Sequence, residues 1–184
     1  MAFVVGGFNE KQGVLNCVES FNLESKTWRK HSNMNIARIA PGCCVFKRKF
    51  LYVFGGRGFD DQEDYYDSIE KLDPELNLWS YVKIKLPRKL SNLFAFPVKK
   101  DYIMVLGGVK SVYFDKKLNR EYEKEIPKER LNSKNVIRVE KIDKNVYLFS
   151  QSKQSWHCLK PLSEKMKVCN VIPSGDFRFN CFLL

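Results

Sequence analysis

Leu51-Tyr52-Val53-Phe54-Gly55-Gly56 is the stretch that decides the fold, because the chain repeats it at a nearly constant spacing. It is an apolar, aromatic run that ends in two glycines, which is typical of a buried strand followed by a turn. Leu72 and Trp79 follow it, seven positions apart.

Two further copies of this pattern flank the first. One ends at Gly6-Gly7 and is followed by Phe21 and Trp28, again seven positions apart, and the other ends at Gly107-Gly108. Successive glycine pairs are 49 and 52 residues apart, and the two tryptophans are 51 apart. Recurrence at this period predicts a repeat architecture in which each repeat forms one small sheet.

The pattern resembles the kelch repeat, closely over residues 3–110 and more weakly over residues 111–184. In that family each repeat is one four-stranded blade of a β-propeller, its second strand ends in a glycine pair, and an aromatic residue stands seven positions before a Trp. The resemblance implies an all-β fold. The chain departs from the family pattern where Phe21 and Leu72 replace the usual Tyr, and where the last repeat lacks both glycines and Trp.

The phase of the repeat predicts a single domain, residues 1–184, that is a kelch-type β-propeller with four blades of four antiparallel strands. The expected blades cover residues 2–34 with 177–184, 40–86, 91–128 and 134–173. Strands are expected at 42–46, 50–54, 68–72 and 78–84 in the second blade, and at 93–98, 102–106, 111–114 and 121–126 in the third. In the fourth blade, strands are expected at 135–141 and 145–149. Alignment with the second blade matches Leu159 to Leu72 and Met166 to Trp79, which assigns Trp156 to a third strand.

The first blade is expected to be completed by the C-terminal strand, residues 177–184, lying beside the N-terminal strand, residues 2–5. This pairing would close the ring at four blades, within the known range of propellers. The alternative is a partial propeller from a longer ring of five to seven blades.

Composition narrows the classes of function. The hydrophobic fraction of 44% supports a packed core, and the absence of any apolar run of 18 residues predicts no membrane span. Without a secretory signal pattern, and with six cysteines that form no Cys-x-x-Cys pair, we expect a cytoplasmic protein with free thiols and no metal site.

The net charge of +11 favours acidic partners. Blade geometry is expected to gather several lysine-rich turns on one face, namely 47–49, 99–100, 116–117 and 160–165. This face suggests binding of RNA or another polyanion as an alternative function, although the sequence carries no RNA-binding motif. A solvated basic face without any partner is the other interpretation.

The loop of residues 57–67 is the main candidate for a binding site, because it carries five acids and three aromatic side chains directly after a glycine pair. The kelch resemblance implies that this loop face binds a peptide or a loop of a partner protein. A solvated acidic loop is the competing interpretation. Three arginines near the blade crossings are expected to ring the central opening or to pair with the acidic loop. The candidate partner-binding residues are Arg38, Arg57, Phe59, Asp60, Asp61, Tyr65, Tyr66, Arg88 and Arg130.

Catalysis is not expected. Some kelch-like propellers are copper oxidases with His and Tyr ligands, whereas this chain has only His31 and His157, which are expected in different blades. No catalytic triad, phosphate loop or metal cluster is found. The sequence therefore predicts a non-catalytic scaffold that needs no cofactor and binds another protein.

Overall fold

The computed structural model describes residues 1–59, 65–122, 133–163, 170–173 and 179–182. All regular structure in these ranges is β-strand, sixteen strands in antiparallel pairs, so the all-β prediction is confirmed. The assignment of residues 1–184 to a single domain stays a prediction.

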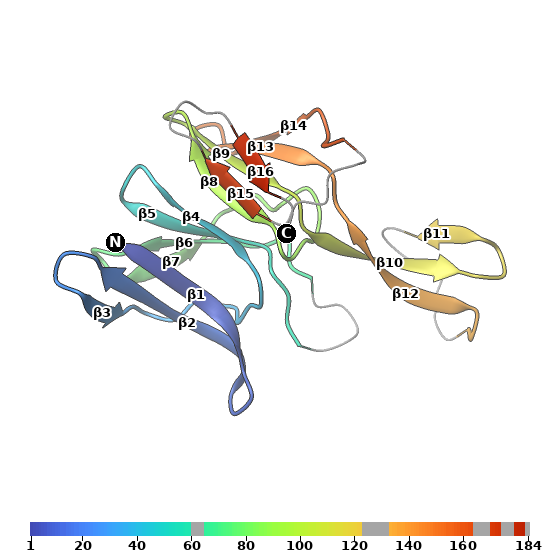
Figure 1. The fold of residues 1–184 in the computed structure, drawn as a ribbon, viewed down its shortest axis with the longest axis horizontal. Coiled ribbons are helices and arrows are strands. Elements are labelled where there is room, and N and C mark those ends of the chain that lie inside the picture. Colours follow the sequence, from blue (N-terminus) through green and yellow to red (C-terminus); the bar gives the residue numbers. More distant parts are fainter. Residues whose placement is uncertain (60–64, 123–132, 164–169, 174–178, 183–184) are drawn as a thin grey trace.

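Two sheets come from the N-terminal half (Figure 1). The first sheet has three strands, β1 (Ala2–Asn9), β2 (Gly13–Asn22) and β3 (Thr27–Lys30). The second sheet has four, β4 (Gly42–Phe46), β5 (Phe50–Phe54), β6 (Ile69–Asp73) and β7 (Leu78–Tyr81), paired in chain order. These strands begin and end within a few residues of those expected for the second blade.

The third sheet corrects the predicted pairing. It contains β8 (Phe94–Val98), β9 (Tyr102–Leu106), β13 (Val146–Ser150) and β14 (Ser155–Leu159), in the order β14-β13-β9-β8. The segment expected to be the second strand of a fourth blade is therefore the third strand of the third sheet. It occupies this inner position because its apolar side chains, Tyr147 and Phe149, are buried.

Between β9 and β13 the chain forms a separate inserted sheet of β10 (Val109–Asp115), β11 (Arg120–Tyr122) and β12 (Val136–Ile142). Figure 1 shows this sheet extending away from the other sheets. β12 was predicted to begin the fourth blade, but it pairs with β10 along seven residues. Its charged residues Arg138, Glu140 and Lys141 suit an open sheet better than the core.

The C-terminal strands also differ from expectation. β16 (Phe179–Phe182) pairs with β15 (Asn170–Pro173) in a hairpin, and in the described part of the chain β1 pairs with β2 alone. The predicted pairing of the C-terminal strand with β1, and with it closure as four blades of four strands, is therefore wrong for the described residues. A local hairpin has a lower loop-closure cost than pairing across the whole chain.

The repeat Trp of the third sheet is Trp156, which corrects its assignment to a third strand. Trp156 lies directly across from Phe149, as Trp79 lies across from Leu72 and Trp28 from Phe21. Each pair is seven positions apart in the sequence. The proposed equivalence of Leu159 with Leu72 is therefore wrong, and Met166, the expected counterpart of Trp79, lies outside the described residues.

Apolar faces pack successive sheets against one another. Val18 and Met34 of the first repeat form one cluster with Leu51, Val53 and Leu72 of the second. A larger cluster joins the second and third sheets, and includes Tyr52, Phe54, Ile69, Ile103, Val105, Tyr147 and Phe149. The core therefore lies between sheets rather than inside any one of them.

In the first two glycine pairs, the first glycine allows the chain to pass close to the segment that leads to the next sheet. Gly6 and Gly55 have φ of 59° and 56°, and a Cβ on either would lie 2.4 Å from a backbone oxygen, that of Arg38 or Leu90 respectively. The next glycine donates a 2.8 Å hydrogen bond to the same oxygen in each case. Arg38 and Leu90 are thus equivalent positions of two successive repeats.

Candidate functional site: the loop end of the sheets

The segments that connect one sheet to the next, residues 31–41 and 82–93, are called the first and second crossings. The loops after the glycine pairs meet these crossings at one end of the molecule, which we call the loop end. The backbone of Arg57, in the β5–β6 loop, exchanges hydrogen bonds of 2.7 and 2.9 Å with Ile39, in the first crossing. Val109 and Ser91 repeat this exchange at 2.8 and 3.1 Å one repeat later. The loop end therefore has a fixed backbone framework.

An exposed aromatic pair stands at the loop end. The rings of Phe8, near the end of β1, and Phe59, in the β5–β6 loop, stack with centroids 5.2 Å apart and an interplanar angle of 7°. Their side chains are 46% and 70% exposed. Arg57, two residues before Phe59, is exposed as well. Large exposed rings held in a fixed geometry offer contact area at little entropic cost, as binding surfaces do.

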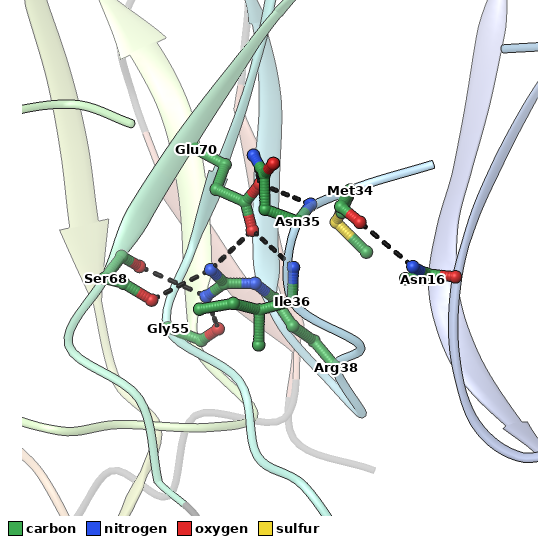
Figure 2. Close-up of polar contacts among 8 residues, drawn as sticks. All are labelled: Asn16, Met34, Asn35, Ile36, Arg38, Gly55, Ser68 and Glu70. Atoms are coloured by element: carbon green, nitrogen blue, oxygen red, sulfur yellow. Dashed lines mark hydrogen bonds and ion pairs between the residues drawn. The ribbon is translucent and has the colours of Figure 1, made fainter. Parts of the chain in front are cut away.

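Arg38 does not face solvent at this end. Arg38 and Glu70 are both 0% exposed and form an ion pair of 2.8 Å (Figure 2). The guanidinium also donates to the backbone oxygens of Gly55 and Ser68, at 2.6 and 3.2 Å, and to Ser68 Oγ at 2.8 Å. Arg38 therefore fastens the first crossing to the base of the β5–β6 loop, and it does not ring an opening.

Glu70 links Arg38 to a second part of the first crossing. Its carboxylate accepts hydrogen bonds from the backbone N–H of Asn35 and Ile36, at 2.8 and 3.2 Å, and from Asn35 Nδ2 at 2.7 Å. Because a buried carboxylate and guanidinium each need partners, removing either one would leave an uncompensated charge. The network thus holds the first crossing in place beneath the loops.

Tyr65 and Tyr66 also make contacts within the chain. Tyr65 is buried, and its hydroxyl donates to Glu140 of the inserted sheet, while Arg138 lies 5.6 Å from its ring centroid. Burial, together with the bond to Glu140, raises the pKa of Tyr65 to about 12. Arg38 lies 5.4 Å from the ring centroid of Tyr66. Tyr65 therefore anchors the inserted sheet to the β5–β6 loop.

The predicted ring of arginines is not formed by equivalent residues, since Leu90 rather than Arg88 occupies the position of Arg38. Arg88 is half-buried. Burial and the neighbouring Asp143 raise the pKa of Tyr147 to about 12, and the charge of Arg88 opposes that shift. Asp60, Asp61 and Arg130 lie outside the described residues.

Sequence reasoning missed two parts of this site. Phe8 lies directly after the first glycine pair, as Phe59 lies soon after the second, so this shared position could have identified it. The contact of the inserted sheet with Tyr65 carried no comparable signal, because the pairing of β12 with β10 was not recognised.

Two of the four lysine-rich turns lie together. Lys47, in the turn between β4 and β5, donates to Gln151, whose backbone N–H bonds to Asp101 beside the turn at 99–100. The other two turns are placed differently, and residues 164–165 lie outside the described residues. Lys116 and Lys117 lie in the turn between β10 and β11 of the inserted sheet, and Lys160 follows β14. Lys49 forms ion pairs with Glu75, at 3.1 Å, and Asp73, at 3.9 Å. The opposite end of the second sheet is therefore partly neutralised.

Among the described residues, no three His, Cys, Asp or Glu side chains lie close enough together to hold a metal ion. Nor does that part of the chain contain a helix long and apolar enough to cross a membrane. His31 is buried, with Nε2 2.8 Å from Ser20 Oγ.

This chain is similar in sequence to proteins that contain kelch repeats. Residues 2–35 and 38–84 match the kelch motif. An F-box/kelch-repeat protein of Arabidopsis thaliana is 35% identical over 66 residues, which are 35% of this chain and 15% of that protein. Kelch domain-containing protein 8B of Bos taurus is 28% identical over 111 residues, 54% of this chain and 30% of that protein.

An enzyme is among the similar proteins. The N-acetylneuraminate epimerase of Vibrio cholerae is 25% identical over 105 residues, covering 55% of this chain and 27% of the enzyme. The chain thus matches less than a third of the length of each of these three proteins.

Proposed function

Because this chain carries kelch repeats, we propose that it is a non-catalytic interaction module that binds another protein, or a peptide segment of one, at the loop end. In this proposal the three main sheets are successive blades of a β-propeller. The stacking of each sheet on the next, with a Trp at the same position of each repeat, supports this arrangement.

The exposed stack of Phe8 and Phe59 is the observation that carries the proposal. The two rings come from neighbouring repeats, so a partner that contacts both would span two sheets. Beneath them the Arg38–Glu70 network fixes the crossing and the loop base. A rigid aromatic pair on such a framework suits an apolar side chain of a partner, and truncation of a central anchor of this kind costs about 1–2 kcal/mol or more of binding free energy.

The experiment compares partner capture by the intact chain and by a variant with Phe8→Ala and Phe59→Ala. Proteins that the wild type retains are identified by mass spectrometry, and the dissociation constant of each purified partner is then measured by calorimetry. Leu76→Ala is the matched control, because Leu76 is 68% exposed in the turn between β6 and β7.

We expect the double variant to bind the partner at least tenfold more weakly than the wild type and the control, with unchanged circular dichroism. Equal affinity of all three proteins would reject the loop end as the binding site.

A non-catalytic role in the cytoplasm is part of the same proposal. The similarity to an epimerase covers only 27% of that enzyme. Cys17, Cys43, Cys44 and Cys158 are free thiols, which agrees with a reducing compartment.

Polyanion binding is the second candidate, since the net charge of +11 favours acidic ligands. Filter binding of RNA at low and moderate salt tests it, because phosphate contacts weaken steeply as salt rises. Retention at low salt that falls steeply with added salt would support this function. The absence of retention even at low salt would remove it.

A further inference from the structure

Three short turns meet at the end of the molecule opposite the loop end, which we call the turn end. β5 and β9 run from this end toward their glycine pairs, and β13 runs antiparallel to β9, so the turns before β5 and β9 and the turn after β13 all lie here. Lys47 Nζ, in the first turn, donates a 3.4 Å hydrogen bond to Gln151, in the third. The backbone N–H of Gln151 donates to Asp101, in the second, at 2.9 Å. The three turns therefore form one surface.

This surface is basic. Exposed cations come from all three turns, and we call them the basic patch: Lys47, Arg48, Lys99, Lys100 and Lys153. Within the described part of the chain, none of the five takes part in an ion pair. The carboxylate of Asp101 lies among them and accepts hydrogen bonds from Ser150 Oγ and Ser152 Oγ, at 2.7 and 2.8 Å, which lower its pKa from the ordinary value. Five cations thus face one carboxylate whose hydrogen bonds are already made within the chain.

Three of these cations stand where the backbone disfavours them. Lys47, Arg48 and Lys99 have φ of 53°, 54° and 58°, a left-handed conformation that is unfavourable for residues with a Cβ. Lys49 N–H donates to the backbone oxygen of Phe46 at 3.1 Å, which closes a turn around the first two. A turn with positive φ at both central positions favours Asn-Gly. Folding therefore does not explain the basic side chains, and backbone strain of this kind is typical of functional positions.

Acidic side chains limit the patch on one side. Lys49, next to Arg48, is paired with Asp73 and with Glu75, whose side chain is 75% exposed in the turn between β6 and β7. A uniformly negative surface, such as an anionic membrane or a long nucleic acid, would extend over these carboxylates and be repelled by them. A short acidic segment can contact the five cations without reaching the acids. The three turns also carry no aromatic residue that could stack on a nucleotide base.

From this arrangement we propose that the basic patch binds a short acidic segment of a partner protein, a run of Asp and Glu residues. An extended segment of eight residues spans roughly 26 Å, and packed sheets lie about 10 Å apart, so its carboxylates reach the turns of both the second and the third sheet. The inference rests on polyanion binding, the second candidate function, to which it assigns a surface and a class of ligand. It is independent of binding at the loop end.

The test is the dissociation constant of a fluorescein-labelled octaglutamate peptide, measured by fluorescence anisotropy at low and at moderate salt. The patch variant combines Lys47→Asn, Arg48→Gly and Lys99→Asn. Asn and Gly suit the left-handed backbone at these positions, so the variant loses three positive charges while its turns form at least as readily.

The matched control combines Lys116→Gln, Lys117→Gln and Lys134→Gln. These lysines are exposed on or next to the inserted sheet, and their replacement removes the same number of positive charges as the patch variant. Circular dichroism and urea unfolding verify that both variants are folded.

We expect the wild type and the control to bind the peptide with similar affinity at low salt, and the patch variant to bind it at least tenfold more weakly. The difference should shrink as salt rises, because salt screens exposed charges. Absence of peptide binding by the wild type at low salt would overturn the proposal. Equal weakening in the patch variant and the control would also overturn it, because net charge alone would then decide binding.

The same three proteins are also tested with duplex RNA and with phosphatidylserine vesicles. Weaker binding of both ligands than of the peptide would support a protein segment as the partner. Patch-dependent binding that is tighter for RNA or for the vesicles than for the peptide would overturn the assignment to a protein segment. That result would leave polyanion binding itself in place, so the failure of this inference is distinguishable from the failure of the function on which it rests.

Discussion

The first and second sheets carry the same pattern of residues but differ in what covers it. Val4 and Val53 stand at the same distance before the glycine pair, and Trp28 and Trp79 lie on the last strand of their sheets, across from Phe21 and Leu72. In the second sheet these side chains pack on the sheet before it, while in the first they face outward. The repeat therefore specifies a surface, and the neighbouring sheet decides whether that surface contributes to stability.

The largest expected difference between the two sheets is at the position of Glu70 and Glu19, which lie two residues before Leu72 and Phe21. Glu70→Ala should lower the free energy of unfolding by about 3–5 kcal/mol, because it leaves the buried charge of Arg38 without its partner. Glu19→Ala, at a half-buried site, should lower it by no more than about 0.5 kcal/mol. Urea denaturation of the two variants measures both values.

A double variant makes this comparison sharper. The next repeat has Leu90 where this one has Arg38, so Arg38→Leu combined with Glu70→Leu should restore most of the stability lost in Glu70→Ala. A double variant no more stable than Glu70→Ala would contradict the account of the ion pair.

The second prediction compares the same substitution at equivalent valines of the two sheets. Val53→Ala should cost roughly 2 kcal/mol of unfolding free energy, from lost apolar burial and the cavity that remains. Val4→Ala should cost less than about 0.5 kcal/mol under conditions where the protein is monomeric. Thermal and urea unfolding of the pair measure the difference, and similar costs at both positions would mean that the first sheet is covered in solution.

The third prediction extends the comparison to the third sheet, where Tyr147 occupies the position of Glu70. Its pKa is raised to about 12 by burial and by Asp143, so the folded state favours the neutral phenol. The resulting stabilisation of the folded state is complete below the ordinary pKa of tyrosine, near 10, and is lost as the pH rises through about 12. Wild-type stability should therefore fall by roughly 1–2 kcal/mol over this interval. Tyr147→Phe should show a smaller fall in pH-dependent urea denaturation, and an equal fall would exclude this tyrosine as its source.

Much of the local structure could be predicted from the sequence. The expected strands at 42–46, 50–54 and 102–106 match β4, β5 and β9 residue for residue, because apolar runs bounded by turns specify strands directly. The segment 145–149 was also expected as a strand and differs from β13 by one residue. The prediction was wrong about which strand pairs with β13. This pairing depends on contacts across an insertion and not on the local sequence pattern.

The candidate site was harder to predict for a different reason. Arg38 was expected at a binding surface because it lies near a blade crossing, but its ion pair with Glu70 allows both side chains to be buried. The spacing of Phe149 and Trp156 is visible in the sequence and matches the earlier pairs, but matching Pro161 to Pro74 assigned Leu159 to the position of Leu72 instead. An insertion within a repeat leaves the seven-residue spacing of the Phe149–Trp156 pair unchanged, but it alters the distance from that pair to the glycine pair of the same repeat.

The most direct test of the account is the pairing of β9 with β13, because it makes the third sheet a repeat of the second. Proton NOEs between backbone groups decide it. We expect cross-strand NOEs between Val105 and Tyr147 and between Ile103 and Phe149, which lie opposite one another. NOEs that instead pair β13 with β12 as a hairpin, with none between β13 and β9, would contradict it.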